Sequence, residues 1–289
     1  MSIVVTGATG RLGRLVIDAL LDQGVPASGI AAVVRDKAKA ADLAERGVEL
    51  RIADYSRPET LAGAFTAGDR VLLISGSEVG QRVPQHAAVI SAAKAAGVAQ
   101  LAYTGILGGP EADFELAAEH RATEELILGS GLPYTLLRNG WYTENYTEHL
   151  APVLEHGAVV ANAGEGRVAS AARADYAAAA AAVLTGEAER HLGRAYELSG
   201  DVAWSFAEYA AEVARQSGEP VTYEDVPAGT HLDILTGAGV PEPFAAILVD
   251  VDRAIGRGRL SATSGDLARL IGRPTTPLAD SVARALRQR

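Results

Sequence analysis

The sequence predicts an α/β fold of the Rossmann type: a doubly wound parallel sheet with a smaller C-terminal substrate lobe. Three observations support this prediction. Short, near-continuous apolar runs alternate with amphipathic stretches along the first half of the chain. A glycine-rich turn joins the first apolar run to the first amphipathic stretch. After Arg138 the loops lengthen, and prolines and glycines become frequent.

Six apolar runs are predicted as strands of a parallel sheet that is covered on both faces. They span residues 3–5, 30–34, 48–53, 70–75, 98–103 and 134–137. Amphipathic or alanine-rich stretches between them are predicted as helices, joined to the strands by right-handed crossovers. The helices span 12–21, 37–47, 84–96 and 117–128, and we expect Gly47, Gly97 and Gly129 to end the last three.

The second half of the chain is predicted to form the smaller lobe and to return segments to the main sheet. An alanine-rich helix at 172–184 has side chains small enough to lie close against a sheet. Further strands are expected at 194–198 and 221–226, with a helix at 206–216 and several helices after them. We therefore expect an NAD(P)-binding Rossmann domain at 1–150 and a substrate-side lobe at 151–289.

The composition is that of an ordinary folded protein with an acidic surface. Hydrophobic residues make up 48% of the 289 and charged residues 21%, which excludes wholesale disorder. There is no cysteine, so disulfides, thiolate metal sites and a catalytic thiol are excluded. The net charge of −10 disfavours nucleic acid and anionic membranes as partners. No signal-peptide pattern or long apolar run is found, so we expect a cytoplasmic protein without membrane contact.

The glycine turn, TGATGRLG at 6–13, has the character of a dinucleotide-binding loop. Gly7 permits the tight turn, and Gly10 lets the backbone approach a pyrophosphate. Gly13 lets the following helix pack close to the sheet. The first N–H groups of that helix, together with its dipole, would bind the phosphates. The alternative is a tight strand–helix turn that binds no ligand.

The residue after the second strand indicates which dinucleotide is bound. An NAD site places Asp or Glu there, whereas this chain has Arg35, whose guanidinium suits a 2′-phosphate. Arg11 and Lys37 could add positive charge, so we favour NADPH. NADH stays an alternative because the adjacent Asp36 could bind a ribose, and Arg35 could simply belong to a solvated helix start. Asp54, after the third strand, is expected near the adenine unless it serves only as a turn residue.

Motifs over nearly the whole chain resemble those of the NmrA-like atypical short-chain dehydrogenases. They are TGATGRLG at 6–13, ADY at 53–55, LLISGSEVGQR at 72–82, AAKAAGV at 92–98, YTLLRNGWYTENY at 134–146, RADYAAAAA at 173–181 and LIGRPTTPLADSV at 270–282. SEVGQR is similar to the quinone-reducing branch of that group. GVPEPFA at 239–245 is similar to its dye-reducing branch.

The resemblance implies a Rossmann domain that binds NADPH and a small lobe that closes a cleft over a small aromatic acceptor. It assigns the pyrophosphate to the glycine turn, the 2′-phosphate to Arg35, and the nicotinamide side of the cleft to the segment after the sixth strand. The coenzyme-binding residues that we expect are Gly7, Ala8, Thr9, Gly10, Arg11, Leu12, Arg35, Asp54, Ser75, Gly76, Ser77, Asn139, Gly140, Trp141, Tyr142 and Arg173. Most follow a strand, where ligands bind in open parallel sheets.

The chain lacks the dyad of Tyr and, four residues on, Lys with which most short-chain dehydrogenases protonate an alcohol oxygen. Its lysines are Lys37, Lys39 and Lys94, and none follows a tyrosine at that spacing. Tyr103 is expected where the fifth strand ends, but Leu107 stands four residues on. Alcohol oxidation by that dyad is therefore disfavoured, and no catalytic residue is assigned.

A quinone needs less from the protein, because it accepts hydride readily and its reduced anion can take a proton from water. The protein then supplies orientation and a dry stacking surface. Trp141, Tyr142 and Tyr146 are candidate stacking partners, and each could equally serve core packing. Tyr103 and His120 are further candidates on the acceptor side. His120 could donate a proton, although a buried hydrogen-bonded histidine is the more ordinary role.

We therefore predict a reductase that transfers hydride from NADPH to quinones or related aromatic acceptors, as a monomer or homodimer. One alternative is a non-catalytic NADPH-binding redox sensor, and another is a triphenylmethane or azo dye reductase. No metal is expected, since the histidines show no metal-ligand spacing. The sequence contains no G-x-S-x-G elbow, which disfavours a serine hydrolase.

Overall fold

The computed structural model describes residues 1–288 and has a seven-stranded parallel sheet at its centre. The strands are β1 (Ile3–Val5), β2 (Ile30–Val34), β3 (Glu49–Ile52), β4 (Arg70–Leu73), β5 (Gln100–Ile106), β6 (Tyr134–Asn139) and β9 (Arg194–Leu198). Their order in the sheet is β3-β2-β1-β4-β5-β6-β9, so the direction of winding reverses between β1 and β4. This order confirms the predicted Rossmann-type fold.

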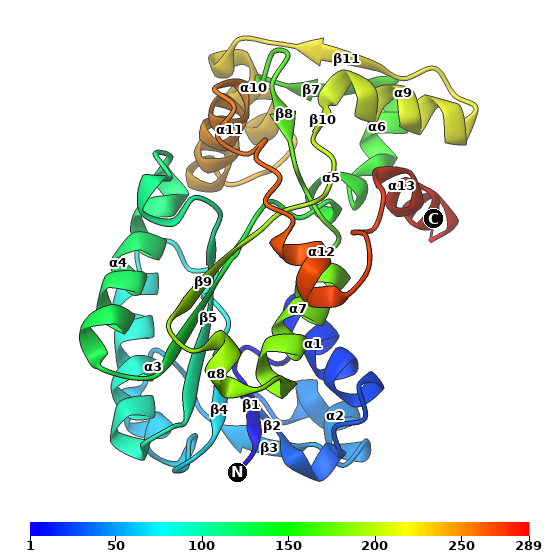
Figure 1. Ribbon diagram of the computed structural model, residues 1–289. Coiled ribbons are helices and arrows are strands. Elements are labelled where there is room, and N and C mark those ends of the chain that lie inside the picture. The colour runs from blue at the N-terminus through cyan, green and yellow to red at the C-terminus, as the bar shows by residue number, and fades with distance from the viewer. Residues whose placement is uncertain (289) are drawn as a thin grey trace.

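Helices cover both faces of the sheet (Figure 1). On one face lie α1 (Arg11–Asp22), α2 (Ala41–Glu45), α7 (Arg173–Thr185), α8 (Ala188–His191) and α12 (Asp266–Ile271). On the other lie α3 (Arg82–Ala96) and α4 (Glu115–Ser130). Side chains of one strand alternate between the two layers: Val5 packs on the α1 side and Val4 on the α3 side. Burial on both faces explains why the strands are near-continuous apolar runs.

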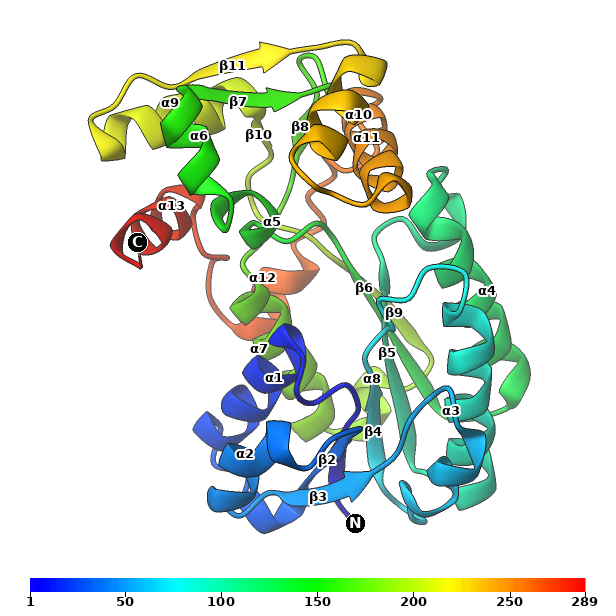
Figure 2. The ribbon, with the colours of Figure 1, turned by 180° about the vertical axis from the view of Figure 1, so that it is seen from behind.

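A second lobe sits above the carboxyl ends of the strands (Figures 1 and 2). Its helices are α5 (Glu144–Thr147), α6 (Leu150–His156), α9 (Phe206–Ser217), α10 (Ala228–Gly237), α11 (Glu242–Gly256) and α13 (Leu278–Arg287). Two small sheets pair β7 (Ala158–Ala161) with β11 (Thr222–Asp225), and β8 (Arg167–Val168) with β10 (Trp204–Ser205). The lobe has its own apolar core, which includes Trp204, Phe206 and Tyr209.

The main sheet takes segments from both halves of the chain. Strand β9 pairs with β6, and the alanine-rich helix α7 packs against α1 and β4. The two lobes therefore share the chain after residue 150, and the expected division there stays a prediction. Over residues 1–288, every helix is too short or too polar to cross a membrane.

Two expected helices differ from those observed. The segment 37–47 is broken into a 3₁₀ turn, η2 (Ala38–Ala40), and the short α2, and Arg14 Nη2 binds the Lys39 carbonyl oxygen at 2.6 Å within η2. The helix expected to end at Gly129 runs on to Ser130, and Gly131 adopts the left-handed conformation with φ +77°. Gly97 ends α3 as predicted, with φ +70°. The remaining 3₁₀ turns are η1 (Ala27–Gly29), η3 (Pro58–Gly63) and η4 (Gly109–Glu111).

Strands β5 and β6 extend beyond their apolar runs. Their pairing continues from Leu101 and Tyr134 to Ile106 and Asn139, through the polar residues Thr104 and Arg138. Backbone hydrogen bonds define these strand ends, whereas the sequence pattern follows only apolar side chains. The extension places Asn139 at the last position of β6, at the edge of the sheet below the second lobe.

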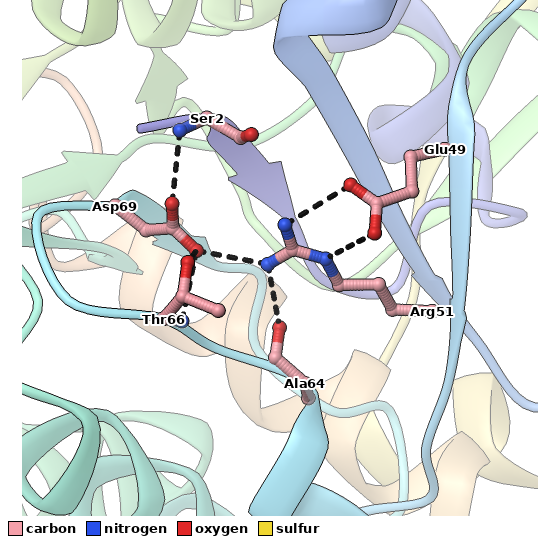
Figure 3. A network of polar contacts seen from close by, with 6 residues as sticks. All are labelled: Ser2, Glu49, Arg51, Ala64, Thr66 and Asp69. Carbon is pink, nitrogen blue, oxygen red and sulfur yellow. Dashed lines mark hydrogen bonds and ion pairs between the residues drawn. The ribbon is translucent and has the colours of Figure 1, made fainter.

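At the amino edge of the sheet, Asp69 joins three segments of the chain (Figure 3). This fully buried carboxylate accepts hydrogen bonds from the backbone N–H groups of Ser2 and Thr66 and from Arg51 Nη1 at 2.8 Å. Burial alone would raise the pKa of Asp69, but these hydrogen bonds bring it below its ordinary value. Arg51 also pairs with Glu49, so the network ties β1 and β3 to the loop before β4.

Replacing Asp69 with Asn is expected to lower the free energy of unfolding by about 3 kcal/mol, because it leaves the buried guanidinium of Arg51 partly uncompensated. Urea denaturation at pH 7 measures the difference. The pKa of Asp69 is lower in the folded state, so its stabilisation is present above about pH 3.9 and is lost on acidification below that value. The exposed Asp22→Asn is the matched control, expected within about 0.5 kcal/mol of wild type. Equal stability of the two variants would contradict this role.

Candidate coenzyme and acceptor site

A cavity of about 1590 Å³ lies between the carboxyl edge of the main sheet and the second lobe. Its walls come from the glycine turn, from the segments after β2, β4 and β6, and from helices α10 and α11. A pocket for one drug-sized ligand measures about 300–1,000 Å³. This cavity therefore has room for a dinucleotide and a second ligand, at the edge where parallel sheets bind ligands.

The glycine turn brings the start of α1 against the end of β1. Gly7 adopts a left-handed conformation with φ +58°, and Gly10 N–H donates to its carbonyl oxygen at 2.9 Å. A Cβ on Gly13 would lie 2.4 Å from the same oxygen, and one on Gly10 would lie 3.1 Å from it. No side chain caps α1, so its first N–H groups are free to bind an anion. This cradle fits a pyrophosphate.

Arg35 lies on the cavity wall at the end of β2 and is 70% exposed. Its Nη1 is 3.4 Å from the Glu78 carboxylate, and Lys39 lines the wall nearby in the chain. Arg11 also lines the cavity, where it pairs with Glu148, and Glu148 binds Arg173 at 2.7 Å as well. Its contribution of charge beside Arg35 stays a prediction. After β2, the basic residues on the cavity wall are Arg35 and Lys39, whereas Lys37 does not line it.

The segment from Ser75 to Ser77 also lines the cavity, held in place by buried groups that the sequence reasoning missed. Gly76 N–H donates to His86 Nε2 at 2.9 Å, and the Gly76 carbonyl accepts from Arg82 Nε at 2.8 Å. Burial and the nearby charge of Arg82 lower the pKa of His86 to about 3, so the imidazole is neutral and can accept that bond. The available signal was the spacing of Arg82 and His86, which are four residues apart and therefore share one face of α3, where both are buried.

The segment after β6 forms the adjoining wall. Asn139, Gly140, Trp141 and Tyr142 all line the cavity, and Asn139 Nδ2 lies 3.4 Å from the Tyr142 hydroxyl. The guanidinium of Arg173 lies 5.2 Å from the centre of the Tyr142 ring, within the range of a cation–π contact. Residues from the end of β6, the loop after it and α7 thus border the same cavity as Thr9, Gly10, Leu12 and Asp54 from the first half of the chain.

Two expected contacts do not reach the cavity wall. Ala8 is fully buried beneath the glycine turn, where its N–H faces the Val33 carbonyl. Tyr103 is fully buried because β5 continues to Ile106, and its ring packs in the layer of α3 and α4. The Tyr103 hydroxyl binds His120 Nδ1 at 2.8 Å, so the Tyr103 side chain lies behind the cavity wall and contacts it only through His120.

His120 and Tyr146 are both on the wall. Burial, with the charge of Arg82, lowers the pKa of His120 to about 3. Its imidazole is therefore neutral near pH 7 and has no imidazolium proton to give. The Tyr146 ring packs edge-on against Trp204 and Phe206, and its buried hydroxyl has no hydrogen-bond partner in the described residues.

The part of the cavity under the second lobe is mostly apolar. Its wall residues there include Phe206, Tyr209, Leu235, Val240, Phe244, Ile247, Leu248, Val251 and Leu260. His231 on α10 and Asp252 on α11 are among the polar side chains that interrupt this surface. The arrangement offers a flat or aromatic ligand a largely dry surface opposite the strand edge.

The strand order, the uncapped glycine turn and the basic residues after β2 define a Rossmann-type dinucleotide-binding protein. The chain belongs to the NAD(P)H-binding family, whose profile matches residues 7–187. This membership confirms the family-level resemblance that the motifs predicted.

Individual relatives extend over nearly the whole chain. It is 49% identical to quinone oxidoreductase 2 of Escherichia coli, over 97% of each chain. The crystal structure of NADPH-dependent quinone oxidoreductase from Escherichia coli with NADPH superposes with a TM-score of 0.94, at 48% identity over 98% of this chain and 99% of that one. The triphenylmethane reductase of Citrobacter sp., complexed with NADP(H), also has a TM-score of 0.94, at 45% identity over 98% of this chain and all of that one.

Replacing Gly13 with Ala is expected to weaken NADPH binding at least about tenfold, since a 2.4 Å contact must move the Gly7 carbonyl and deform the cradle. Alanine favours a helix by about 1 kcal/mol over glycine, so any loss arises from this contact. Fluorescence titration with NADPH measures binding, and circular dichroism confirms folding. Gly63→Ala, with open space at its Cβ, is the control. A folded Gly13→Ala protein with wild-type affinity would refute the cradle.

Proposed function

We propose that this protein is an NADPH-dependent reductase that transfers hydride to quinones and related small aromatic acceptors. One observation carries the proposal: a single cavity joins a cradle for a phosphorylated dinucleotide to an apolar chamber under the second lobe. The identity with quinone oxidoreductase 2 over nearly the whole chain supports it. The cytoplasmic location and the oligomeric state stay predictions.

NADPH, when bound, supplies the two electrons of the reaction as hydride. The N–H groups at the start of α1 would hold its pyrophosphate, and Arg35 its 2′-phosphate. Glu78 would release Arg35 on binding, at little cost, because an exposed ion pair contributes only about 0–1 kcal/mol. Ser75, just after β4, and Asn139, at the end of β6, would orient the remainder.

The acceptor would lie against the apolar wall of the second lobe. Trp141 packs against the core of the second lobe and Tyr142 against that of the main sheet, and both line the cavity, so their rings can position a flat acceptor beside the nicotinamide. A quinone fits a chain without the Tyr/Lys dyad, because no alcohol proton has to be removed. The apolar wall would reduce the access of water to the acceptor during transfer.

A spectrophotometric assay tests the proposal. With 1,4-benzoquinone, the purified protein should consume NADPH at a rate proportional to enzyme concentration, with hydroquinone as product. Tight NADPH binding without turnover of any acceptor would instead favour the redox sensor. Reduction of a cationic triphenylmethane dye is a second candidate activity, favoured by the likeness to the Citrobacter reductase.

Replacing Arg35 with Ala is expected to raise the KM for NADPH about 10- to 100-fold, the worth of charge-assisted hydrogen bonds to a phosphate. The KM for NADH should change less than about threefold, because NADH lacks that phosphate. Steady-state kinetics with both coenzymes measures the two effects. Arg46→Ala, an exposed arginine away from the cavity wall, is the control. Equal effects on both coenzymes would argue against a 2′-phosphate contact.

A further inference from the structure

Asp252 is a buried carboxyl group on the apolar part of the cavity wall. It lies on α11 and is 7% exposed. Its Oδ2 accepts a hydrogen bond from the backbone N–H of Asn162 at 3.2 Å and lies 3.4 Å from His231 Nδ1. Over residues 1–288, no arginine or lysine forms an ion pair with it. A buried carboxyl without a cationic partner favours its neutral, protonated form.

The surroundings of Asp252 act in the same direction. Burial raises the pKa of Asp252 to about 7, the hydrogen bond from the Asn162 N–H partly opposes this rise, and the charge of Asp225 adds a lesser rise. Burial lowers the pKa of His231, whose Nδ1 lies 2.5 Å from Asn162 Oδ1 and therefore donates to it as a neutral imidazole. The other titratable groups close enough to sense its charge, Tyr146 and Tyr223, are neutral phenols whose pKa values are raised.

The reaction proposed above needs one proton that the described residues of the other wall do not offer. Hydride addition to a quinone leaves a hydroquinone monoanion, and a proton must then reach its oxygen. His120 is neutral, and the Tyr103 hydroxyl behind it is buried. Burial raises the pKa of the Tyr142 phenol on the same wall, which makes it a poor proton donor. Apart from water, a group on the second lobe is therefore the better source of the proton.

We propose that Asp252 is the acid that protonates the reduced acceptor, with Asn162 and His231 as positioning residues. This inference rests on the proposed function. The acceptor takes a hydride from NADPH and becomes an oxyanion; the O–H bond of Asp252 breaks and its proton passes to that oxygen. Neutral hydroquinone leaves, and water returns a proton to the carboxylate. The sum is quinone, NADPH and one proton giving hydroquinone and NADP⁺.

The test compares two acceptors that differ in their need for a proton. A quinone needs one, whereas a cationic triphenylmethane dye takes hydride at its central carbon and becomes neutral without one. Asp252→Asn keeps an oxygen for the Asn162 N–H but has no transferable proton. At pH 6 we expect its kcat with benzoquinone to fall about 100-fold, while its kcat with the dye stays within about twofold of wild type because that step moves no proton. Asp233→Asn, an exposed acid on α10, is the matched control.

The pH profile supplies a second readout. In the wild-type protein, kcat/KM for benzoquinone should fall as the pH rises through about 7, since the acid form is lost. Asp252→Asn should lack this limb. Infrared difference spectra should show a protonated carboxyl band that disappears over the same pH range and is absent from the variant. The infrared measurement does not depend on turnover. It also shows whether the folded variant has lost only the carboxyl group of Asp252.

Each outcome decides between the explanations. Wild-type quinone kinetics in Asp252→Asn, or an equal loss of kcat with both acceptors, would overturn the role of Asp252 as proton donor while leaving the reductase in place. A wild-type protein that binds NADPH but reduces neither acceptor would overturn the proposed function, and the role of Asp252 with it. A selective loss with the quinone supports both.

Discussion

The close contact between the first strand and the first helix is the constraint on which the rest of the site depends. Gly13 faces the Gly7 carbonyl at a distance that leaves no room for a Cβ, so α1 begins directly over the end of β1. Its unbonded N–H groups are thereby aimed into the cavity at the point where the strand order reverses. The alanine-rich helix α7 then packs on α1, which brings Arg173 to the same cavity from the second half of the chain.

Two kinds of ion pair surround this site, and their burial separates their roles. The pair of Arg35 and Glu78 is exposed, so it contributes about 0–1 kcal/mol and can be exchanged for a phosphate contact. Arg138 is different: its partly buried guanidinium binds Glu124 at 2.7 Å and Glu197 at 2.8 Å, which ties β6 to α4 and β9. Exchange is costly there because a buried charge would lose its partner. The exposed ion pair of Arg35 can therefore be exchanged at the coenzyme site, whereas the partly buried ion pairs of Arg138 hold the sheet and its helices together.

The parts of the site that depend on local sequence could be predicted, and the parts that depend on distant residues could not. The glycine turn and Arg35 directly follow apolar runs, so predicting the strands from those runs also placed these residues at strand ends. Tyr103 was misplaced because polar residues continue β5 past its apolar run, and strand alternation then turns the ring into the α3 layer. Asp252 lies 90 residues from Asn162, whose N–H it accepts. Only tertiary packing joins them, and nothing in the local pattern marks either.

The charge balance of the acceptor chamber explains why an unpaired acid suits it better than a salt bridge. Before proton transfer the chamber would hold a neutral carboxyl group and an anionic reduced acceptor; afterwards it would hold a carboxylate and a neutral product. The number of charges in the apolar space is the same on both sides, so the step avoids the cost of burying an additional ion. An arginine beside Asp252 would hold the carboxylate in its charged form and remove the proton that the acceptor needs. The neutral pair of Asn162 and His231 instead fixes the carboxyl group while leaving its protonation free to change.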